Sequence, residues 1–166
     1  LIEIYARIPG REYDFTKLIC KSILDENKRI SNFLMKCVGI PYYLFCSCKS
    51  LIKINIPFSV TSIGDHAFYN CYSLEEVVLP SSLNIIGESS FEYCYHLAKL
   101  NIPPSVTKIG SRAFYYCYNL NIIIPSSLKS AGIDSFYKCK SVLFENNITT
   151  IPEHMFDGSY YYYDIK

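Results

Sequence analysis

The chain lacks the charge excess and the long apolar runs that characterise several large functional classes. Its 166 residues carry a formal net charge of only +1, so it has no electrostatic footprint for a nucleic-acid backbone or an anionic membrane. No apolar run approaches the roughly 18 residues that a membrane span needs. The chain begins at Leu1, without a methionine and without a basic-then-apolar leader. We therefore expect it to be a fragment or a processed piece of a longer protein.

Signals for catalysis and for metal binding are missing as well. The sequence contains no Gly-rich phosphate loop, no nucleophile elbow and no carboxylate pair repeated on one face. Cys46 and Cys48 form a Cys-x-Cys pair, but no second pair stands at ligand spacing, and His66, His96 and His154 are scattered. We predict a protein that is not an enzyme and that needs neither a metal ion nor a cofactor.

What the sequence has instead is an internal repeat. Cys48, Cys71, Cys94 and Cys117 stand 23 residues apart, and Cys139 follows after 22. A phenylalanine precedes each of these cysteines by three residues, and an apolar residue follows each by three. A fixed period of this size is typical of a solenoid, in which one short coil cannot bury its own apolar face and stacks on copies of itself.

The pattern within one coil predicts one short strand and a return limb. In Leu51-x-x-Ile54-x-Ile56-Pro57 the residues before the proline alternate apolar and variable, as a strand with one buried face requires. Gly64, and the glycines at the same position of the next coils, suit a tight bend with positive φ. We predict a repeat solenoid with one short parallel strand in each coil of about 23 residues, and return limbs of irregular or 3₁₀ character.

These motifs resemble a known repeat family. The pattern Leu-x-x-Ile-x-Ile-Pro-x-Ser-Val-x-x-Ile-Gly-x-x-Ala-Phe-x-x-Cys, read from Leu51 to Cys71, is similar to the BspA-like class of leucine-rich repeats. The resemblance covers about residues 40 to 156. It implies a leucine-rich-repeat solenoid used in adhesion or recognition, of the kind found in surface proteins of anaerobic bacteria and parasitic protists, and it brings no catalytic residues. Serines stand near the place of that fold's usual buried asparagine: Ser59, Ser82, Ser105 and Ser127.

The two ends of the chain depart from the period. Residues 1–38 fit it poorly, and we predict a degenerate or capping segment there. Residues 39–159 form the predicted repeat array. Residues 160–166 form a Tyr-rich tail, in which Tyr160 to Tyr163 are expected to make a strand or an adhesive edge.

The repeated cysteines are candidates for a structural ladder in the stacked interior. Cα atoms at equivalent positions of adjacent coils would lie within the range that a disulfide allows, but side chains in a ladder point the same way and do not converge. Free cysteine is often buried and packs as a small hydrophobe. We expect a reduced ladder, in which a buried hydroxyl makes Cys94→Ser more costly than Cys94→Ala. The ladder comprises Cys71, Cys94, Cys117 and Cys139.

Two sets of outward side chains are candidate binding residues. Binding energy at interfaces concentrates in a few aromatic or charged anchors. The first set alternates with the buried residues of the strands and comprises Lys53, Asn55, Glu76, Val78, Lys99 and Asn101. The second set crowds around the return limbs, where stacked tyrosines could equally serve only to shield the column, and comprises Tyr93, Tyr95, Tyr116 and Tyr118. We favour the strand residues, following the usual site of leucine-rich-repeat proteins.

These observations lead to one functional hypothesis and one alternative. We expect a binding module for a protein or host-surface ligand, in a surface or secreted adhesin-like protein. The alternative is an intracellular scaffold or substrate-receptor module that uses the same solenoid in the cytoplasm. Nucleic acid is not an expected partner, because the chain has almost no net charge.

Overall fold

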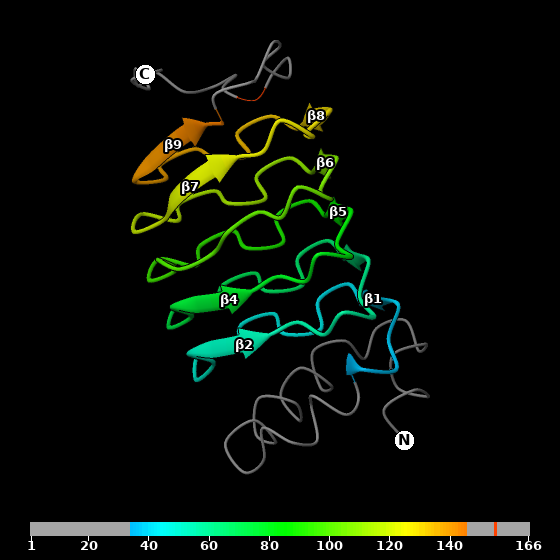
Figure 1. The fold of residues 1–166 in the computed structure, drawn as a ribbon. Coiled ribbons are helices and arrows are strands. Elements are labelled where there is room, and N and C mark those ends of the chain that lie inside the picture. Colours follow the sequence, from blue (N-terminus) through cyan, green and yellow to red (C-terminus); the bar gives the residue numbers. More distant parts are fainter. Residues whose placement is uncertain (1–33, 146–154, 156–166) are drawn as a thin grey trace.

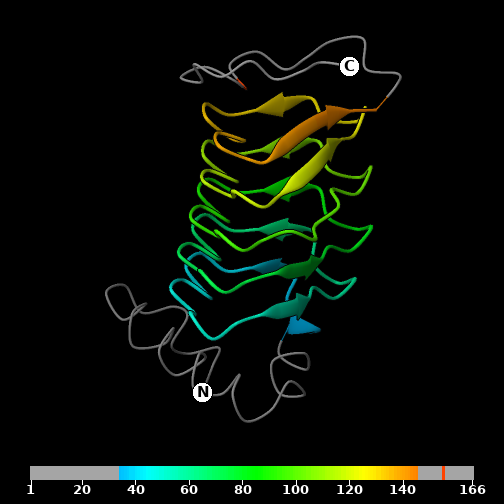
Figure 2. The same cartoon turned by 90° about the vertical axis from the view of Figure 1, so that its left-hand side faces the viewer.

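The protein folds into a column of stacked coils (Figure 1). The computed structural model describes residues 34–145 and Met155; the predictions for the N-terminal segment before residue 34 and for Tyr160 to Tyr163 lie outside the described residues. Each coil runs from a strand on one side, through a second short strand, into a return limb of consecutive turns. Viewed from the side, the coils stack as a nearly straight column (Figure 2).

The predicted strands lie on one side of this column and pair in parallel, although the coil that begins at Leu97 contributes only an isolated bridge at Lys99. β2 (Lys53–Asn55) pairs with β4 (Glu76–Val78), with Lys53 opposite Glu76, so one full period separates the partners. Further along the array, β7 (Asn121–Ile124) pairs with β9 (Ser141–Phe144). The parallel solenoid predicted from the period is confirmed, with little helix in the described residues.

Each coil also contributes a second strand, two residues long, which comes before the return limb. These strands form one continuous parallel sheet of five strands. Its members in order are β1 (Gly39–Ile40), β3 (Ser62–Ile63), β5 (Ile85–Ile86), β6 (Lys108–Ile109) and β8 (Ser130–Ala131). We call it the spine sheet, since its five strands follow one another from coil to coil without a gap.

The core is a set of ladders built from the repeated residues. The rings of Phe45, Phe68 and Phe91 stack in parallel with centroids 4.9 Å apart, and the stack continues through the next two coils. The phenylalanines, the ladder cysteines and the apolar residues that follow them are all buried. Full burial of one large apolar side chain contributes about 1.5–3 kcal/mol. Each coil therefore gains most of its stability from its neighbours.

Serine hydroxyls add polar links between coils at the position that leucine-rich repeats usually fill with asparagine. The hydroxyl of Ser82 donates to the carbonyl of Val60 at 2.8 Å, and that of Ser127 donates to Val106 at 3.0 Å. Ser105 departs from this pattern, because its hydroxyl is buried without a hydrogen-bond partner. Serine thus supplies short links from coil to coil.

The return limbs are held by two kinds of backbone hydrogen bond. Some amides close turns within their own coil, as Cys71 does onto Phe68, while alternate amides reach the next coil, as Phe68 does onto Ser90 at 2.7 Å. Two non-glycine residues of each limb have positive φ, for example His66 at 57° and Asn70 at 60°. The backbone amides of both residues also donate hydrogen bonds to the next coil. The left-handed conformation therefore points the backbone amide of each residue along the column, and the intercoil hydrogen bond offsets the energetic cost of that conformation.

The glycines have a different role from the one predicted. The residues with positive φ are non-glycine residues such as His66 and Asn70, whereas Gly64, Gly87 and Gly110 do not have positive φ. A Cβ on Gly64 would lie 2.7 Å from the carbonyl oxygen of Ile40 and 2.7 Å from the amide nitrogen of Tyr42. The prediction that these positions need glycine for positive φ is wrong. They need it because the backbones of adjacent coils approach too closely for a side chain.

The strand side of the column has a break that the spine sheet lacks. Five residues separate Leu97 from Pro103, but only four separate Leu120 from Pro125. β2 and β4 form one sheet with a further bridge from Glu76 to Lys99, and β7 and β9 form another. Within the described residues, no backbone hydrogen bond joins 97–102 to 120–124. The missing residue of this 22-residue coil interrupts the strand ladder at this point.

Candidate binding surface

The outward side chains of the strands form two rows along the column, which we call the strand face. In β2 the burial pattern is exposed, buried, exposed, so Lys53 and Asn55 point away from the core while Ile54 is buried. The same alternation holds in the next coils, as predicted. The first row contains Lys53, Glu76, Lys99, Asn121 and Ser141; the second contains Asn55, Val78, Asn101, Ile123 and Leu143.

The first row is polar and carries charges of both signs. The Lys53 ammonium donates to Glu76 Oε1 at 2.7 Å. This hydrogen bond is the main reason that the pKa of Glu76 lies below its ordinary value, and the charges of Lys53 and Lys99 lower it further. At the other end of the row, the Ser141 hydroxyl donates to Asn121 Oδ1 at 2.8 Å. The row therefore offers a partner both charges and side-chain amide groups.

The second row becomes apolar toward the C-terminal coils. Val78, Ile123 and Leu143 are exposed by 47%, 55% and 44%, respectively. Asn101 separates Val78 from the other two, but Ile123 and Leu143 are opposite each other on the paired strands β7 and β9. A single exposed apolar side chain is ordinary, whereas this adjacent pair resembles the apolar centre of an interface beside its polar rim. The strand face thus combines a polar row with a partly apolar one.

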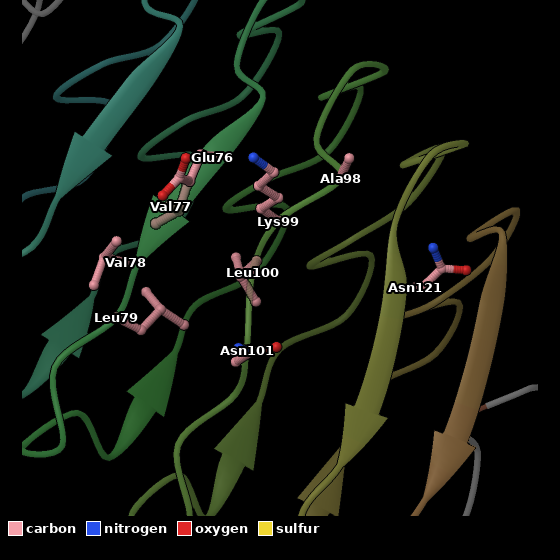
Figure 3. A pocket seen from close by; sticks show the side chains of 9 residues that line it. All are labelled: Glu76, Val77, Val78, Leu79, Ala98, Lys99, Leu100, Asn101 and Asn121. Carbon is pink, nitrogen blue, oxygen red and sulfur yellow. The ribbon is translucent and has the colours of Figure 1, made fainter.

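A hollow of about 490 Å³ opens on this face beside the break in the strand ladder (Figure 3). β4 lines one part of it, the segment from Ala98 to Asn101 lines another, and Asn121 contributes from the far side of the break. The amide of Leu100 has no hydrogen-bond partner among the described residues, whereas the equivalent amide of Val77 donates to Lys99. The hollow therefore combines charged side chains with one backbone amide that has no partner among the described residues.

The predicted tyrosines form a compact block on the return limbs. Tyr93 stacks on Tyr116 with centroids 5.6 Å apart, and Tyr95 stacks on Tyr118 at 5.7 Å. Within each coil the rings meet edge to face. Since the ring faces are used in stacking along the column, the block presents mainly ring edges and hydroxyls. Tyr118, which is 49% exposed, offers the largest accessible ring.

The ladder cysteines are buried and free of disulfides, as predicted. Burial raises the pKa of each ladder thiol well above its ordinary value, which makes them poor nucleophiles. Each thiol donates a hydrogen bond to the phenylalanine carbonyl of the preceding coil, for example Cys94 to Phe68 at 3.2 Å. The ladder is therefore part of the core and not a reactive site.

Among residues 34–145, no group of three or more His, Cys, Asp or Glu side chains is placed to hold a metal ion. Over the same residues the structure has no helix with the length and apolar character of a membrane span.

Comparison with known proteins is in keeping with this geometry. Residues 38–162 match the family described as BspA type Leucine rich repeat region (6 copies). The chain belongs to the BspA-type leucine-rich repeat family. The resemblance drawn from the motif between Leu51 and Cys71 is thereby confirmed. A search of curated proteins gives no significant match.

Two crystal structures of bacterial leucine-rich repeat proteins resemble the array. The T. pallidum Leucine Rich Repeat protein (TpLRR) has 34% sequence identity and a TM-score of 0.58 over 61% of this chain and 49% of its own. A leucine-rich repeat protein from Bacteroides ovatus ATCC 8483 has 33% identity and a TM-score of 0.58 over 64% of this chain and 28% of its own. The chain therefore spans half or less of the length of these relatives.

Sequence reasoning found the first three coils of the strand face but missed its continuation. Asn121, Ile123, Ser141 and Leu143 extend the two rows. A strict period places the residues of the fourth coil one position away from where they lie, because that coil is one residue shorter. The spacing from Leu120 to Pro125 was the signal that could have found Asn121 and Ile123, whereas Ser141 and Leu143 lie only 20 residues further on.

Proposed function

We propose that this chain is a non-enzymatic protein-binding module that acts in adhesion or recognition as part of a surface or secreted protein, and that the strand face holds the partner. The observation that supports this most is the strand face itself, a polar row beside a partly apolar row that runs along five coils. Repeat solenoids commonly use such extended surfaces for binding. The family supports the surface location by analogy, and leucine-rich repeats of this kind are generally not enzymes.

The tyrosine block serves mainly to shield the column. Its rings stack on one another, which leaves few ring faces for a partner. The strand face, by contrast, has exposed side chains of mixed chemistry and a hollow of about 490 Å³. Of the two candidate sets, the strand residues therefore have the stronger support.

Two variants separate these faces in a cell-binding assay. The first replaces Lys53, Glu76 and Lys99 with alanine, and the second replaces the four block tyrosines with phenylalanine, which keeps the stacking and removes the hydroxyls. The purified chain, fluorescently labelled, is titrated onto host epithelial cells and read by flow cytometry, and circular dichroism checks that each variant is folded. We expect at least about a tenfold loss of binding in the first variant and little change in the second.

Three outcomes would count against the proposal. Absence of saturable binding to intact cells would refute the adhesive role, and loss of binding only in the phenylalanine variant would place the partner on the tyrosine block. Antibody staining of intact, unpermeabilised source cells tests the location separately. If the repeats stained only after permeabilisation, the module would act as an intracellular scaffold.

A further inference from the structure

A second hollow lies on the return limbs, away from the strand face. We call it the limb hollow; its volume is about 460 Å³. Its walls come from four successive coils and carry aromatic rings, two carboxyl groups and one guanidinium group. The lining side chains used below are those of Tyr43, His66, Tyr69, Glu88, Glu92, Tyr93 and Arg112.

Glu92 is the unusual residue in this hollow. Two residues before the ladder cysteine, the neighbouring coils have tyrosine, at Tyr69, Tyr115 and Tyr137. Glu92 thus places a carboxyl group in a row of rings. A departure from an otherwise consistent pattern is often a functional position.

The carboxyl group of Glu92 is buried without a cation. Glu92 is only 4% exposed, and within residues 34–145 no salt bridge reaches it. Its side chain hydrogen-bonds with Tyr93, whose pKa is raised first by burial and then by Glu92. The guanidinium of Arg112 instead lies over the ring of Tyr115, 5.2 Å from its centroid. A buried carboxylate is costly unless a positive charge offsets it.

His66 also lines the hollow, and one of its ring nitrogens lacks a hydrogen-bond partner. Its ring stacks on Tyr43 with centroids 4.7 Å apart and lies tilted against Tyr69 at 5.5 Å. Its Nδ1 is buried and has no hydrogen-bond partner among the described residues. In the Nε2-protonated form, Nδ1 is an acceptor. The walls of the hollow therefore contain a buried carboxyl group without a cation and a buried ring nitrogen without a partner.

A ligand that fits this hollow must carry a positive charge and several N–H donors, and the rest of the ligand must pack against aromatic rings. Glu88 and Glu92 against Arg112 leave the hollow with an excess of negative charge, which disfavours anions. No group of three metal-ligating side chains is present in the part of the chain that the structure describes. An ammonium group supplies the positive charge and the N–H donors that the Glu92 carboxylate lacks, and tyrosine rings attract cations and pack against alkyl chains.

We propose that the limb hollow binds an alkylammonium group, of the kind carried by a lysine side chain or by a free polyamine. The Glu92 carboxylate accepts its N–H groups, and the rings of Tyr69 and Tyr93, which meet edge to face with centroids 5.6 Å apart, form a wall along its alkyl chain. This site does not depend on the strand face, so its test needs no protein partner.

The test titrates the whole ¹⁵N-labelled chain with n-butylammonium chloride and follows the backbone amide signals by NMR. n-Butanol, which has the same alkyl chain without the charge, is the matched control ligand. We expect saturable shifts at residues around the limb hollow with butylammonium and none with butanol. Equal responses to both ligands, or no saturable shift with butylammonium, would overturn the proposal.

Two variants of Glu92 test the role of the carboxylate. E92Q removes the charge at nearly constant shape and should raise the Kd for butylammonium at least about tenfold. E92Y installs the residue that the neighbouring coils have at this position and should abolish binding while the melting temperature stays equal or rises. If E92Y still bound butylammonium with the original Kd, or if both variants failed to fold, Glu92 would be a structural residue and the proposal would fail.

Two further ligands identify the source of the ammonium group. An acetylated and amidated Gly-Lys-Gly peptide presents a lysine side chain, and spermidine presents a free polyamine. Tighter binding of the peptide supports a lysine of a partner protein, and tighter binding of spermidine supports a free amine. Displacement of butylammonium by equimolar Mg²⁺ or Ca²⁺ would instead indicate a metal site and contradict the proposal.

Discussion

Replacement of Cys94 by alanine should destabilise the protein at neutral pH, and this cost should vanish near pH 10 and reverse above it. The Cys94 side chain is fully buried, and its thiol donates to the Phe68 carbonyl at 3.2 Å. The alanine variant loses the packing of one sulfur atom and one weak hydrogen bond. The expected cost at pH 7 is about 1–2 kcal/mol of unfolding free energy.

The pH dependence follows from the burial of the thiol. Burial raises the pKa of Cys94 well above its ordinary value of 9.0. Below pH 9 the thiol is protonated in both states, so its stabilising contribution is fully present. As pH rises above 9, only the unfolded state loses the proton, which favours unfolding. At pH 10 this ionisation stabilises the unfolded wild type by about 1.4 kcal/mol, and at pH 11 by about 2.7 kcal/mol.

An alanine has no such proton, so the two proteins should become equally stable near pH 10. Above that pH, the alanine variant should become the more stable one. Urea denaturation followed by circular dichroism at pH 7, 9, 10 and 11, under identical reducing conditions, measures the difference directly. A constant difference between pH 7 and pH 11 would mean that the thiol is not buried in the folded state, and would refute the reasoning.

The Cys94→Ser variant separates ionisation from packing. Its hydroxyl does not titrate in this range, so it should show the same change with pH relative to wild type as the alanine variant. The structure also revises the expectation that serine costs more than alanine, because the Phe68 carbonyl lies within reach of a buried hydroxyl. We now expect serine to be no more destabilising than alanine at pH 7.

Three further predictions test the intercoil contacts. Gly64→Ala should cost about 3 kcal/mol of unfolding free energy, because the added Cβ meets backbone atoms of the preceding coil. Gly39→Ala should cost under about 1 kcal/mol, because its Cβ meets the Ser62 hydroxyl, which can rotate away. Equal costs for the two variants in chemical denaturation would contradict this prediction. Hydrogen exchange followed by NMR should be faster at the Leu100 amide than at the Val77 amide, because only the latter has an intercoil acceptor, and equal protection would mean that the strand ladder is unbroken. Deletion of residues 72–94, one full period, should keep the circular dichroism spectrum and lower the melting temperature, and an unfolded product would contradict the additive stacking of coils.

Periodicity predicted the interior of the column well, for a direct physical reason. A residue that recurs at the same phase of a solenoid occupies the same place in every coil, so its repetition reveals whether it points inward. Phe68, Cys71 and Leu74 are buried as their phase predicted, and Lys53 and Asn55 are exposed. The family resemblance followed from the same repeated motif.

The features that the sequence did not predict depend on distances between coils. Glycine at position 64 was interpreted through its freedom in φ, yet the distance to Ile40 of the preceding coil determines it. The one-residue shortening between Leu120 and Pro125 was visible as a 22-residue interval. Its consequence was not visible, because sequence spacing alone does not say which side of a coil takes up the loss. The limb hollow was missed because its acceptors come from different coils.

The break in the strand ladder has a consequence for how such arrays diversify. The coil that lost a residue kept its place in the spine sheet and in the phenylalanine stack, while only the strand side changed register. In this array the loss of one residue was therefore accommodated on one side of the repeat unit without a change in the other two. Tandem duplication followed by such small changes would generate new recognition surfaces on an unchanged scaffold. A lineage that gains or loses single residues between the leucine and the proline of a coil could thus alter what it recognises without having to evolve a new fold.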